Sequence, residues 1–292
     1  MRLPFKLKKK LLGMIDAFYA VWPQPHPGRQ SLLNCKIVSH RGEHDNVTVL
    51  ENTLAAFERA CAGGVWGIEF DVRWTRDLQP VVFHDRDCLR LYGDSLPISQ
   101  VSLAELKAAF PLIPSLLEVI DALGKKIHLM VEIKREPYPD PGHQKRVLRE
   151  LFSSLRPEED YHFMALQLEM FHAVDFVPRA ACVPIAELNI RSLSSVVLSN
   201  AFGGLAGQYL LFTDGLIRKH KKVGQQIGTG YVGSRNALYR ELNRGVDWIF
   251  CNFSKSVGRH KKVRDFRTQF VLCIWGMRAT IQIPNIPEEA KS

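Results

Sequence analysis

Four short motifs between residues 39 and 85 decide the fold that we expect of this chain. They read Ser39-His40-Arg41-Gly42, Glu51-Asn52-Thr53, Gly67-Ile68-Glu69-Phe70-Asp71 and Val81-Val82-Phe83-His84-Asp85. Histidines and carboxylates stand here at the ends of apolar runs, and Glu132 ends a further run. Barrel enzymes carry their functional side chains at such strand ends, on one mouth of the barrel. The motifs therefore predict an enzyme built on a barrel.

The rest of the chain repeats this alternation of short apolar runs and helical patterns, which is typical of a parallel sheet with crossover helices. The strands are expected at residues 36–40, 67–72, 127–133, 162–168, 182–188, 208–212, 225–230 and 248–251, with another extended piece at 80–83. The helices are expected at 53–62, 103–109, 115–123, 144–155, 192–198, 214–220 and 234–244. Eight strands with intervening helices predict an α/β protein with an eight-stranded (β/α)8, or TIM, barrel.

Composition and length agree with one large domain. With 292 residues, 46% hydrophobic and 24% charged, the chain can bury a large core. We predict a catalytic domain at 31–258, flanked by an N-terminal extension at 1–30 and a C-terminal extension at 259–292.

The formal net charge of +9 points to an anionic partner, which is a phosphate-bearing substrate, an anionic membrane or nucleic acid. Basic residues cluster at 6–10, 218–222 and 259–267 without a recognisable nucleic-acid module, so no nucleic-acid partner is expected. The six cysteines form no CxxC pair, which argues against a zinc site or a compact disulfide framework. A reducing compartment, the cytoplasm, is the simpler prediction.

The N-terminus combines basic residues at 6–10 with an apolar stretch at 11–22. The stretch is too short to span a bilayer, and it lacks a clear signal-peptide cleavage site. Leu11, Ile15, Phe18 and Trp22 recur at helical spacing, which predicts a basic amphipathic helix. Such a helix would either contact the inner membrane surface peripherally or pack against the barrel, and both readings stay open.

Glu69 and Asp71 are two residues apart on one predicted strand, so both side chains point to the same face. Acids facing the helix layer would be costly unless paired, and we therefore place them in the lumen, at the carboxyl-end mouth. Glu132 is the third carboxylate. Three clustered carboxylates need a cation, and oxygen ligands suit Mg²⁺, Ca²⁺ or Mn²⁺ better than zinc. The alternative is purely structural ion pairing of Glu69 and Asp71 with Arg41, Arg73 or Lys134.

Cleavage of a phosphodiester needs a base, an acid and positive charge on the phosphate oxygens. His40 and His84 each end an apolar run, so they would stand at one mouth on opposite sides of a phosphate. Arg41 and Lys134 would supply the charge beside the metal. The sequence leaves open which histidine is the base, and whether water or a neighbouring hydroxyl of the substrate attacks.

Three more residues, Glu51, Asn52 and Asp85, complete the candidate site as secondary members. Glu51 has two readings. It either reaches the metal site or begins the following helix, where an acid favours the positive helix end.

In order and spacing these motifs resemble the glycerophosphodiester phosphodiesterase family. The family pattern is His-Arg-Gly, Glu-Asn-Thr, Glu-x-Asp, Val-Val-x-His-Asp and a Glu-x-Lys strand end, which here is Glu132-Ile133-Lys134. The resemblance is specific across residues 36–135 and weak afterwards.

The resemblance implies a TIM barrel of the phospholipase C-like phosphodiesterase type. It implies one divalent metal held by Glu69, Asp71 and Glu132, with His40 and His84 in acid–base catalysis. The implied activity is hydrolysis of glycerophosphodiesters to glycerol 3-phosphate and an alcohol. The alternatives are a membrane-associated lysophospholipase D-like enzyme acting on lysophospholipids, and a catalytically silent barrel that binds phosphate groups.

Two departures from the family pattern fall outside the metal and phosphate residues. Leu50 replaces the usual proline after an insertion-like segment at 44–48, and residues 228–232 lack the usual tryptophan-containing motif. Both departures affect the expected leaving-group side of the site, so the sequence leaves the alcohol of the substrate open.

Overall fold

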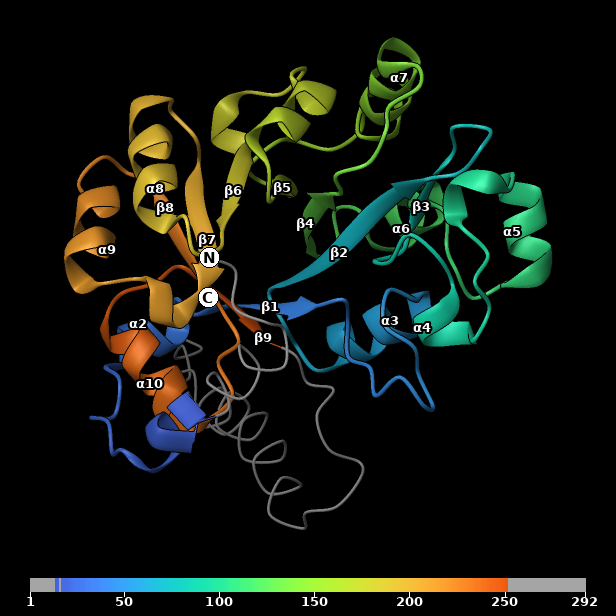
Figure 1. Cartoon of the computed structure of the whole chain (residues 1–292). Helices are drawn as coiled ribbons and strands as arrows, with labels where there is room; N and C mark the ends of the chain where they lie inside the picture. The colour runs from blue at the N-terminus through green and yellow to red at the C-terminus, as the bar shows by residue number, and fades with distance from the viewer. Residues whose placement is uncertain (1–13, 16, 252–292) are drawn as a thin grey trace, which may run out of the picture. The chain divides into compact units, whose positions relative to one another are not determined.

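Eight parallel strands close into a barrel in the computed structural model, which describes residues 14, 15 and 17–251 (Figure 1). Strand β1 pairs with both β2 and β9, which closes the sheet on itself. The predicted TIM barrel is confirmed. In chain order its strands are β1 (Lys36–His40), β2 (Gly67–Trp74), β4 (His128–Ile133), β5 (Tyr161–Ala165), β6 (Cys182–Ala186), β7 (Gly204–Gln208), β8 (Gln226–Gly230) and β9 (Trp248–Cys251).

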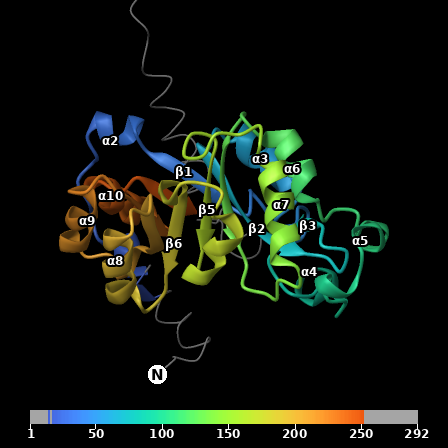
Figure 2. The same ribbon diagram turned by 90° about the horizontal axis from the view of Figure 1, so that it is seen from above.

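Helices follow the strands and lie outside the barrel (Figures 1 and 2). Ser115 and Ser234 each accept a hydrogen bond from the backbone amide three residues on, which fixes the start of α6 and α10. The helices are α2 (Arg29–Leu33), α3 (Leu54–Ala62), α4 (Leu89–Tyr92), α5 (Leu103–Ala109), α6 (Leu116–Leu123), α7 (Pro141–Leu151), α8 (Ile190–Ser199), α9 (Asp214–Lys221) and α10 (Arg235–Asn243). Short 3₁₀ turns occur at η1 (Ile98–Gln100), η2 (Leu168–Val174), η3 (Arg179–Ala181) and η4 (Tyr209–Leu211).

The extended piece expected near residue 80 is a ninth strand, β3 (Pro80–Val82), which pairs antiparallel with the end of β2. It is anchored by a separate apolar cluster formed by Val81, Phe83, Cys88, Ile98, Leu106 and Ile113. His84 directly follows this cluster. The cluster therefore fixes the backbone that carries His84 beside the carboxyl end of β2.

The strand expected at 208–212 was placed too late in the chain. The observed strand is β7 (Gly204–Gln208), and the apolar residues after it form η4. Tyr209 and Phe212 are buried, which explains the strong apolar signal. At Gly204 an added Cβ would lie 2.2 Å from the Gln226 carbonyl oxygen. Close strand packing thus required small residues that carry little strand signal.

An apolar layer fills the middle of the lumen. It consists of Val38, Met130, Met164, Val183, Ala206, Trp248 and Phe250. Because side chains alternate along a strand, the lumen-facing residues on either side of Met130 are His128 and Glu132. The layer therefore separates an acidic carboxyl end from an amino end that holds His128.

The predicted N-terminal helix is present at residues 14, 15 and 17–21, and residues 1–13 and 16 lie outside the described residues. Tyr19 packs edge-on against Tyr209, with ring centroids 5.8 Å apart, and the Arg240 guanidinium lies over its ring. Phe18 and Trp22 stack on each other and are about half exposed. The helix therefore packs on the barrel with one face and leaves an aromatic face uncovered.

No helix among the described residues is long and apolar enough to cross a membrane. The C-terminal extension predicted at 259–292 lies entirely outside the described residues.

Candidate active site

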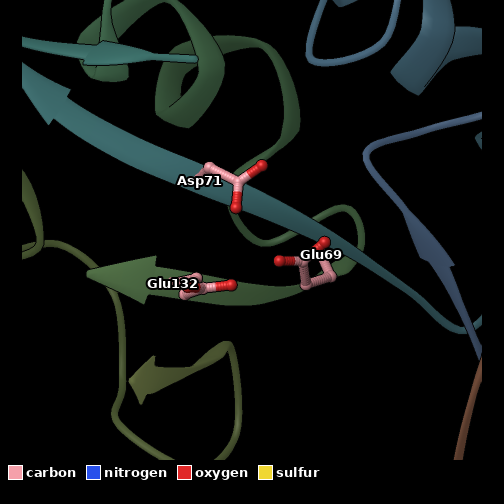
Figure 3. A group of neighbouring side chains, drawn as sticks. All are labelled: Glu69, Asp71 and Glu132. Carbon is pink, nitrogen blue, oxygen red and sulfur yellow. The ribbon is translucent and has the colours of Figure 1, made fainter. Parts of the chain in front are cut away.

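Glu69, Asp71 and Glu132 come together in the lumen at the carboxyl end of the barrel (Figure 3). The register of β2 and β4 places Asp71 opposite Glu132, and Glu69 lies two residues earlier on the same face of β2. One carboxylate oxygen from each residue lies within 4.8 Å of the others, and all three side chains are buried. The placement in the lumen agrees with the sequence prediction.

Two cations neutralise part of this acidic group. The Lys134 ammonium lies 2.6 Å from Asp71 Oδ1 and 2.8 Å from Glu132 Oε1, and the Arg41 Nε lies 3.1 Å from Asp71 Oδ2. Burial alone would raise the pKa of Asp71, but Lys134 and Arg41 outweigh it and hold that pKa well below its usual range. Asp71 is therefore the fully compensated member of the group.

Glu69 is the least compensated member, because Arg41 and Lys134 only partly offset its burial and its acidic neighbours. Burial, with Asp71 and Glu132 close by, raises the pKa of Glu69 well above its usual value. Burial also raises the pKa of Glu132, although Lys134 acts in the opposite direction. Glu69 Oε2 is buried and has no hydrogen-bond partner in the structure. An orphaned carboxylate oxygen beside two other acids fits a divalent cation, which would supply the missing positive charge.

The His-Arg-Gly motif forms a tight turn that places Arg41 over the acids. Arg41 has a φ of 59° and Gly42 a φ of 77°, both in the left-handed region. A Cβ at Gly42 would lie 2.7 Å from the Ala56 carbonyl carbon, so only glycine fits between the turn and α3. The Arg41 amide donates to the Glu69 carbonyl oxygen at 2.7 Å. Backbone strain at Arg41 is thus held by the surrounding structure, as is common at functional sites.

The Glu-Asn-Thr motif supports this turn from the other side. Asn52, at a φ of 57°, donates its amide to the Arg41 carbonyl oxygen and its side-chain NH₂ to Asp71 Oδ2. Thr53 caps α3. Glu51 does not join the acidic group; its carboxylate instead accepts a 2.8 Å hydrogen bond from Arg41. Glu51 therefore lies outside the acidic group and contacts it through the Arg41 guanidinium.

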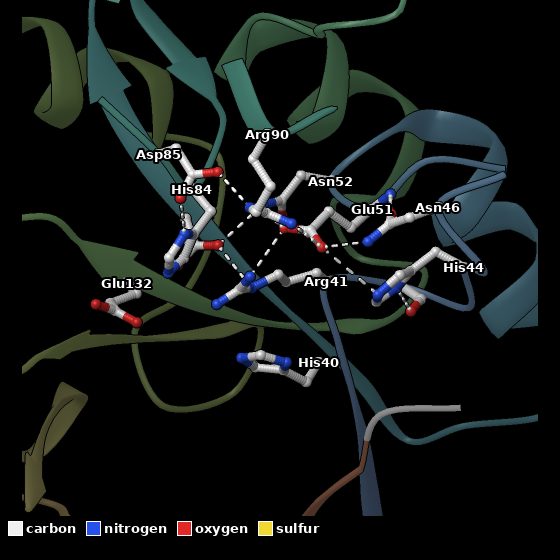
Figure 4. A network of polar contacts seen from close by, with 12 residues as sticks. His40, Arg41, His44, Asn46, Glu51, Asn52, His84, Asp85, Arg90 and Glu132 are labelled. Atoms are coloured by element: carbon white, nitrogen blue, oxygen red, sulfur yellow. Dashed lines mark hydrogen bonds and ion pairs between the residues drawn. The ribbon is translucent and has the colours of Figure 1, made fainter. Parts of the chain in front are cut away.

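His40 and His84 lie at the same mouth (Figure 4). His40 ends β1, and its Nε2 is 3.6 Å from Glu69 Oε2. His84 Nδ1 is 2.7 Å from Asp85 Oδ1. Their side chains are 23% and 31% exposed, so both imidazoles reach the opening while they contact carboxylates inside it. This arrangement allows proton transfer at a group bound over the acids.

Two residues that support the site, Arg73 and Arg90, are not among the site residues predicted from the sequence. Arg73 donates twice to the His84 carbonyl oxygen and pairs with Glu136 at 3.1 Å. Arg90 bridges Glu51 and Asp85. The alternation of side chains along β2 places Arg73 on the same face as Asp71, two residues later, but does not indicate that it supports His84. No local pattern predicts the long-range partners of Arg90.

The insertion-like segment at 44–48 is a loop held by its own hydrogen bonds. Asp45 Oδ1 accepts from the amides of Val47, Thr48 and Val49, and Asn46 donates to Glu51 Oε2 at 2.8 Å. His44 is buried, and its Nδ1 is 2.9 Å from the Gly42 carbonyl oxygen. The segment therefore supports the turn at Gly42 and the Glu51 carboxylate.

Residues 40–168 match the sequence profile of the glycerophosphoryl diester phosphodiesterase family. The matched segment begins at His40 and contains both histidines, the three acids and Lys134.

Curated relatives are similar to part of this chain. A glycerophosphodiester phosphodiesterase of Caldanaerobacter subterraneus subsp. tengcongensis is 34% identical over 125 residues, which are 39% of this chain and 51% of the relative. A human lysophospholipase D is 37% identical over 105 residues, 35% of this chain and 33% of the relative. The chain thus spans about half the length of the first relative and a third of the second.

The barrel itself is similar to solved structures. A phosphodiesterase of Oleispira antarctica, solved with the product sn-glycerol-3-phosphate, superimposes with a TM-score of 0.64 over 75% of this chain and 93% of that chain. At 21% sequence identity this likeness shows the fold alone.

Proposed function

We propose that this chain is a metal-dependent phosphodiesterase that hydrolyses glycerophosphodiesters to glycerol 3-phosphate and an alcohol. One observation carries the proposal: two partly exposed histidines and a buried triad of acids share one mouth of the barrel. The family of residues 40–168, the bacterial relative and the product named for the Oleispira antarctica structure support the substrate class. The proposed catalytic domain is 31–258.

In this proposal Glu69, Asp71 and Glu132 hold one divalent cation, Mg²⁺ or Ca²⁺, with Mn²⁺ as a further candidate. When bound, the cation supplies charge stabilisation for the phosphate oxygens in the transition state. Arg41 contributes further positive charge. The Lys134 ammonium has three N–H donors. Two of them face Asp71 and Glu132, so the third remains for a phosphate oxygen.

The two histidines carry the proton transfers. One of His40 and His84 accepts the proton of the attacking water or substrate hydroxyl, and the other protonates the departing alcohol. The contact with Asp85 places the N–H of His84 on Nδ1 and leaves Nε2 for the substrate side. Asn52 holds Asp71 in place for the cation.

The test is release of glycerol 3-phosphate from glycerophosphocholine, glycerophosphoethanolamine, glycerophosphoinositol and glycerophosphoglycerol. Each assay is run with Mg²⁺, Ca²⁺, Mn²⁺ or EDTA, for the wild type, His40→Asn and Glu69→Gln. Metal-dependent release that both variants lose supports the proposal. A folded wild type that releases no product from any diester contradicts it and favours the silent phosphate-binding barrel.

A second candidate is a lysophospholipase D-like enzyme at the inner membrane surface. The specific observation is the uncovered face of the N-terminal helix, where Met14, Phe18, Val21 and Trp22 are 51–76% exposed. The basic residues at 6–10 precede this face in the sequence and would meet anionic lipid. The human relative named a lysophospholipase D is consistent with a lipid substrate.

Vesicle flotation and choline release from lysophosphatidylcholine separate the two candidates. The lipid proposal expects wild type to float with vesicles containing anionic lipid, and Phe18→Ser with Trp22→Ser to stay in solution. Turnover of glycerophosphocholine without flotation, and without turnover of the lysolipid, assigns the chain to an enzyme with a small soluble substrate.

A further inference from the structure

Arg90 joins two loops that carry opposite sides of the candidate site (Figure 4). Its Nε lies 2.5 Å from Asp85 Oδ2, and its terminal nitrogens lie 2.5 and 3.1 Å from the two oxygens of Glu51. Glu51 belongs to the loop between β1 and α3, and Asp85 to the loop after β3. One guanidinium therefore fixes the relative position of the Arg41 side and the His84 side.

The contact with Arg90 determines what Asp85 can do for His84. Asp85 uses Oδ1 for His84 and Oδ2 for Arg90, so both carboxylate oxygens are committed. Burial would raise the pKa of Asp85, but the hydrogen bonds from His84 and Arg90 lower it. An ionised carboxylate only accepts hydrogen bonds, so the His84 nitrogen that faces it carries a proton.

Without Arg90, the Asp85 carboxylate would keep the contact of Oδ1 with His84, but Oδ2 would be open to water. Rotation about its side-chain torsions would then let the His84 ring turn, because the ring is 31% exposed and is held by this one carboxylate contact among the described residues. Glu51 would also lose the partner that contacts both of its oxygens. Asn46 and Arg41 would remain on Glu51, so the loss would fall mainly on the His84 side.

We propose that Arg90 is a positioning residue that holds Asp85, and through it His84, in the orientation needed for proton transfer. The proposal rests on the phosphodiesterase function proposed above. A direct role in phosphate binding is the competing reading, because the Arg90 side chain is 43% exposed. The geometry favours positioning, since each of the three guanidinium nitrogens already contacts a carboxylate.

Lysine separates these two readings. It keeps the positive charge of Arg90 but cannot contact Asp85 and both oxygens of Glu51 with a planar fork. Under the positioning proposal, Arg90→Lys and Arg90→Ala both lower kcat by about 10- to 100-fold and leave KM within about threefold. Under phosphate binding, Arg90→Ala raises KM, Arg90→Lys restores much of the affinity, and the proposal is overturned.

A double-mutant cycle with Asp85→Asn gives the second readout. If Arg90 acts through Asp85, Arg90→Ala adds little to the kcat loss of Asp85→Asn. Additive losses contradict the proposal. The matched control is Arg76→Ala, since Arg76 forms a surface pair with Glu105 at 2.8 Å from the same part of the chain. This control is expected to leave kcat and KM unchanged.

A spectroscopic readout keeps the test independent of turnover. In ¹⁵N NMR of the histidine-labelled full chain, the wild-type His84 should show a protonated Nδ1 that is hydrogen-bonded to Asp85. Arg90→Ala and Arg90→Lys should show averaged tautomers, while Arg76→Ala should match the wild type. Unchanged His84 signals in a folded Arg90→Ala variant overturn the positioning role. If the wild type turns over no diester, the proposed function fails, but the His84 signals still test whether Arg90 positions His84.

Discussion

Among the described residues, two histidine pairs lie at opposite ends of this barrel, and they differ in exposure and in partners. His40 and His84 at the carboxyl end are 23% and 31% exposed and contact carboxylates. His128 and His162 at the amino end are 6% and 4% exposed and contact each other at 2.8 Å. Exposure and partners, not residue type, distinguish the proposed catalytic imidazoles from the buried pair.

His128 and His162 form a short hydrogen-bond chain that ends on the Glu159 carbonyl oxygen. The Glu159 carbonyl oxygen can only accept, so His128 Nδ1 donates to it at 2.9 Å, and His128 Nε2 accepts from His162 Nδ1. Trp66 stacks on His128 with ring centroids 4.2 Å apart. Burial lowers the pKa of His128 to about 4 and that of His162 to about 3. Both rings are therefore neutral at neutral pH and pack as polar core residues.

Disruption of the cation site should produce the largest difference between the ends. We expect EDTA, or Glu132→Gln, to lower kcat by about 10³-fold or more, because several kcal/mol of charge stabilisation in the transition state are lost. Met130→Leu, one layer below in the lumen, conserves volume and should keep kcat within about threefold. Assays of glycerol 3-phosphate release check this. Equal losses in the two variants would mean that the acids act only through packing.

The histidines should come next. His40→Asn and His84→Asn are each expected to lower kcat by about 10²- to 10³-fold, since each removes one proton-transfer group. The matched variant at the other end, His162→Asn, should leave kcat within about threefold and lower the melting temperature instead. A kcat loss in His162→Asn comparable with that in His84→Asn would remove the distinction between the pairs.

At Glu69, the same substitution that removes activity should raise the stability of the metal-free protein. The raised pKa of Glu69, caused by burial and then by Asp71 and Glu132, means that the ionised carboxylate destabilises the metal-free fold. The fold is therefore most stable below the ordinary pKa of 4.5, where Glu69 is protonated, and it loses this stability as the pH rises through the raised pKa. In EDTA at pH 8, Glu69→Gln should therefore melt above the wild type by thermal denaturation, although it is inactive. A lower melting temperature would show that another group compensates the charge of Glu69.

The smallest effect is the pH dependence contributed by the amino-end pair. Because both pKa values are depressed below the ordinary 6.5, the unfolded chain binds these protons first. The contribution to stability is complete above about pH 6.5 and is lost as the pH falls toward 4, at no more than about 1.4 kcal/mol per pH unit for each ring. Urea unfolding at pH 7.5, 6.5, 5.5 and 4.5 should show a shallower decline for His128→Gln with His162→Gln than for the wild type. Parallel curves would show that these rings are not kept neutral by the fold.

Much of the carboxyl end could be predicted from local sequence. The spacing of Glu69 and Asp71 fixes their common face because side chains alternate along a strand. Strand ends at His40 and Glu132 were recognisable because apolar runs stop there. The prediction of β7 was wrong in position, since Gly204 packs closely against Gln226 and the small residues of this strand carry little strand signal. The glycerophosphodiesterase motifs cover only residues 36–135, so the later half depended on periodicity alone.

The sequence by itself determined which residues can do chemistry and which of them share a strand face. The tertiary structure decided which of those residues meet. Closure of β1 onto β2 brings Arg41 to Asp71, and the turn after β3 brings Asp85 to Arg90. The pairing of β4 with β5 places His128 beside His162, 34 residues apart in the chain. Charge compensation and pKa depend on these long-range distances and on burial, neither of which local spacing encodes.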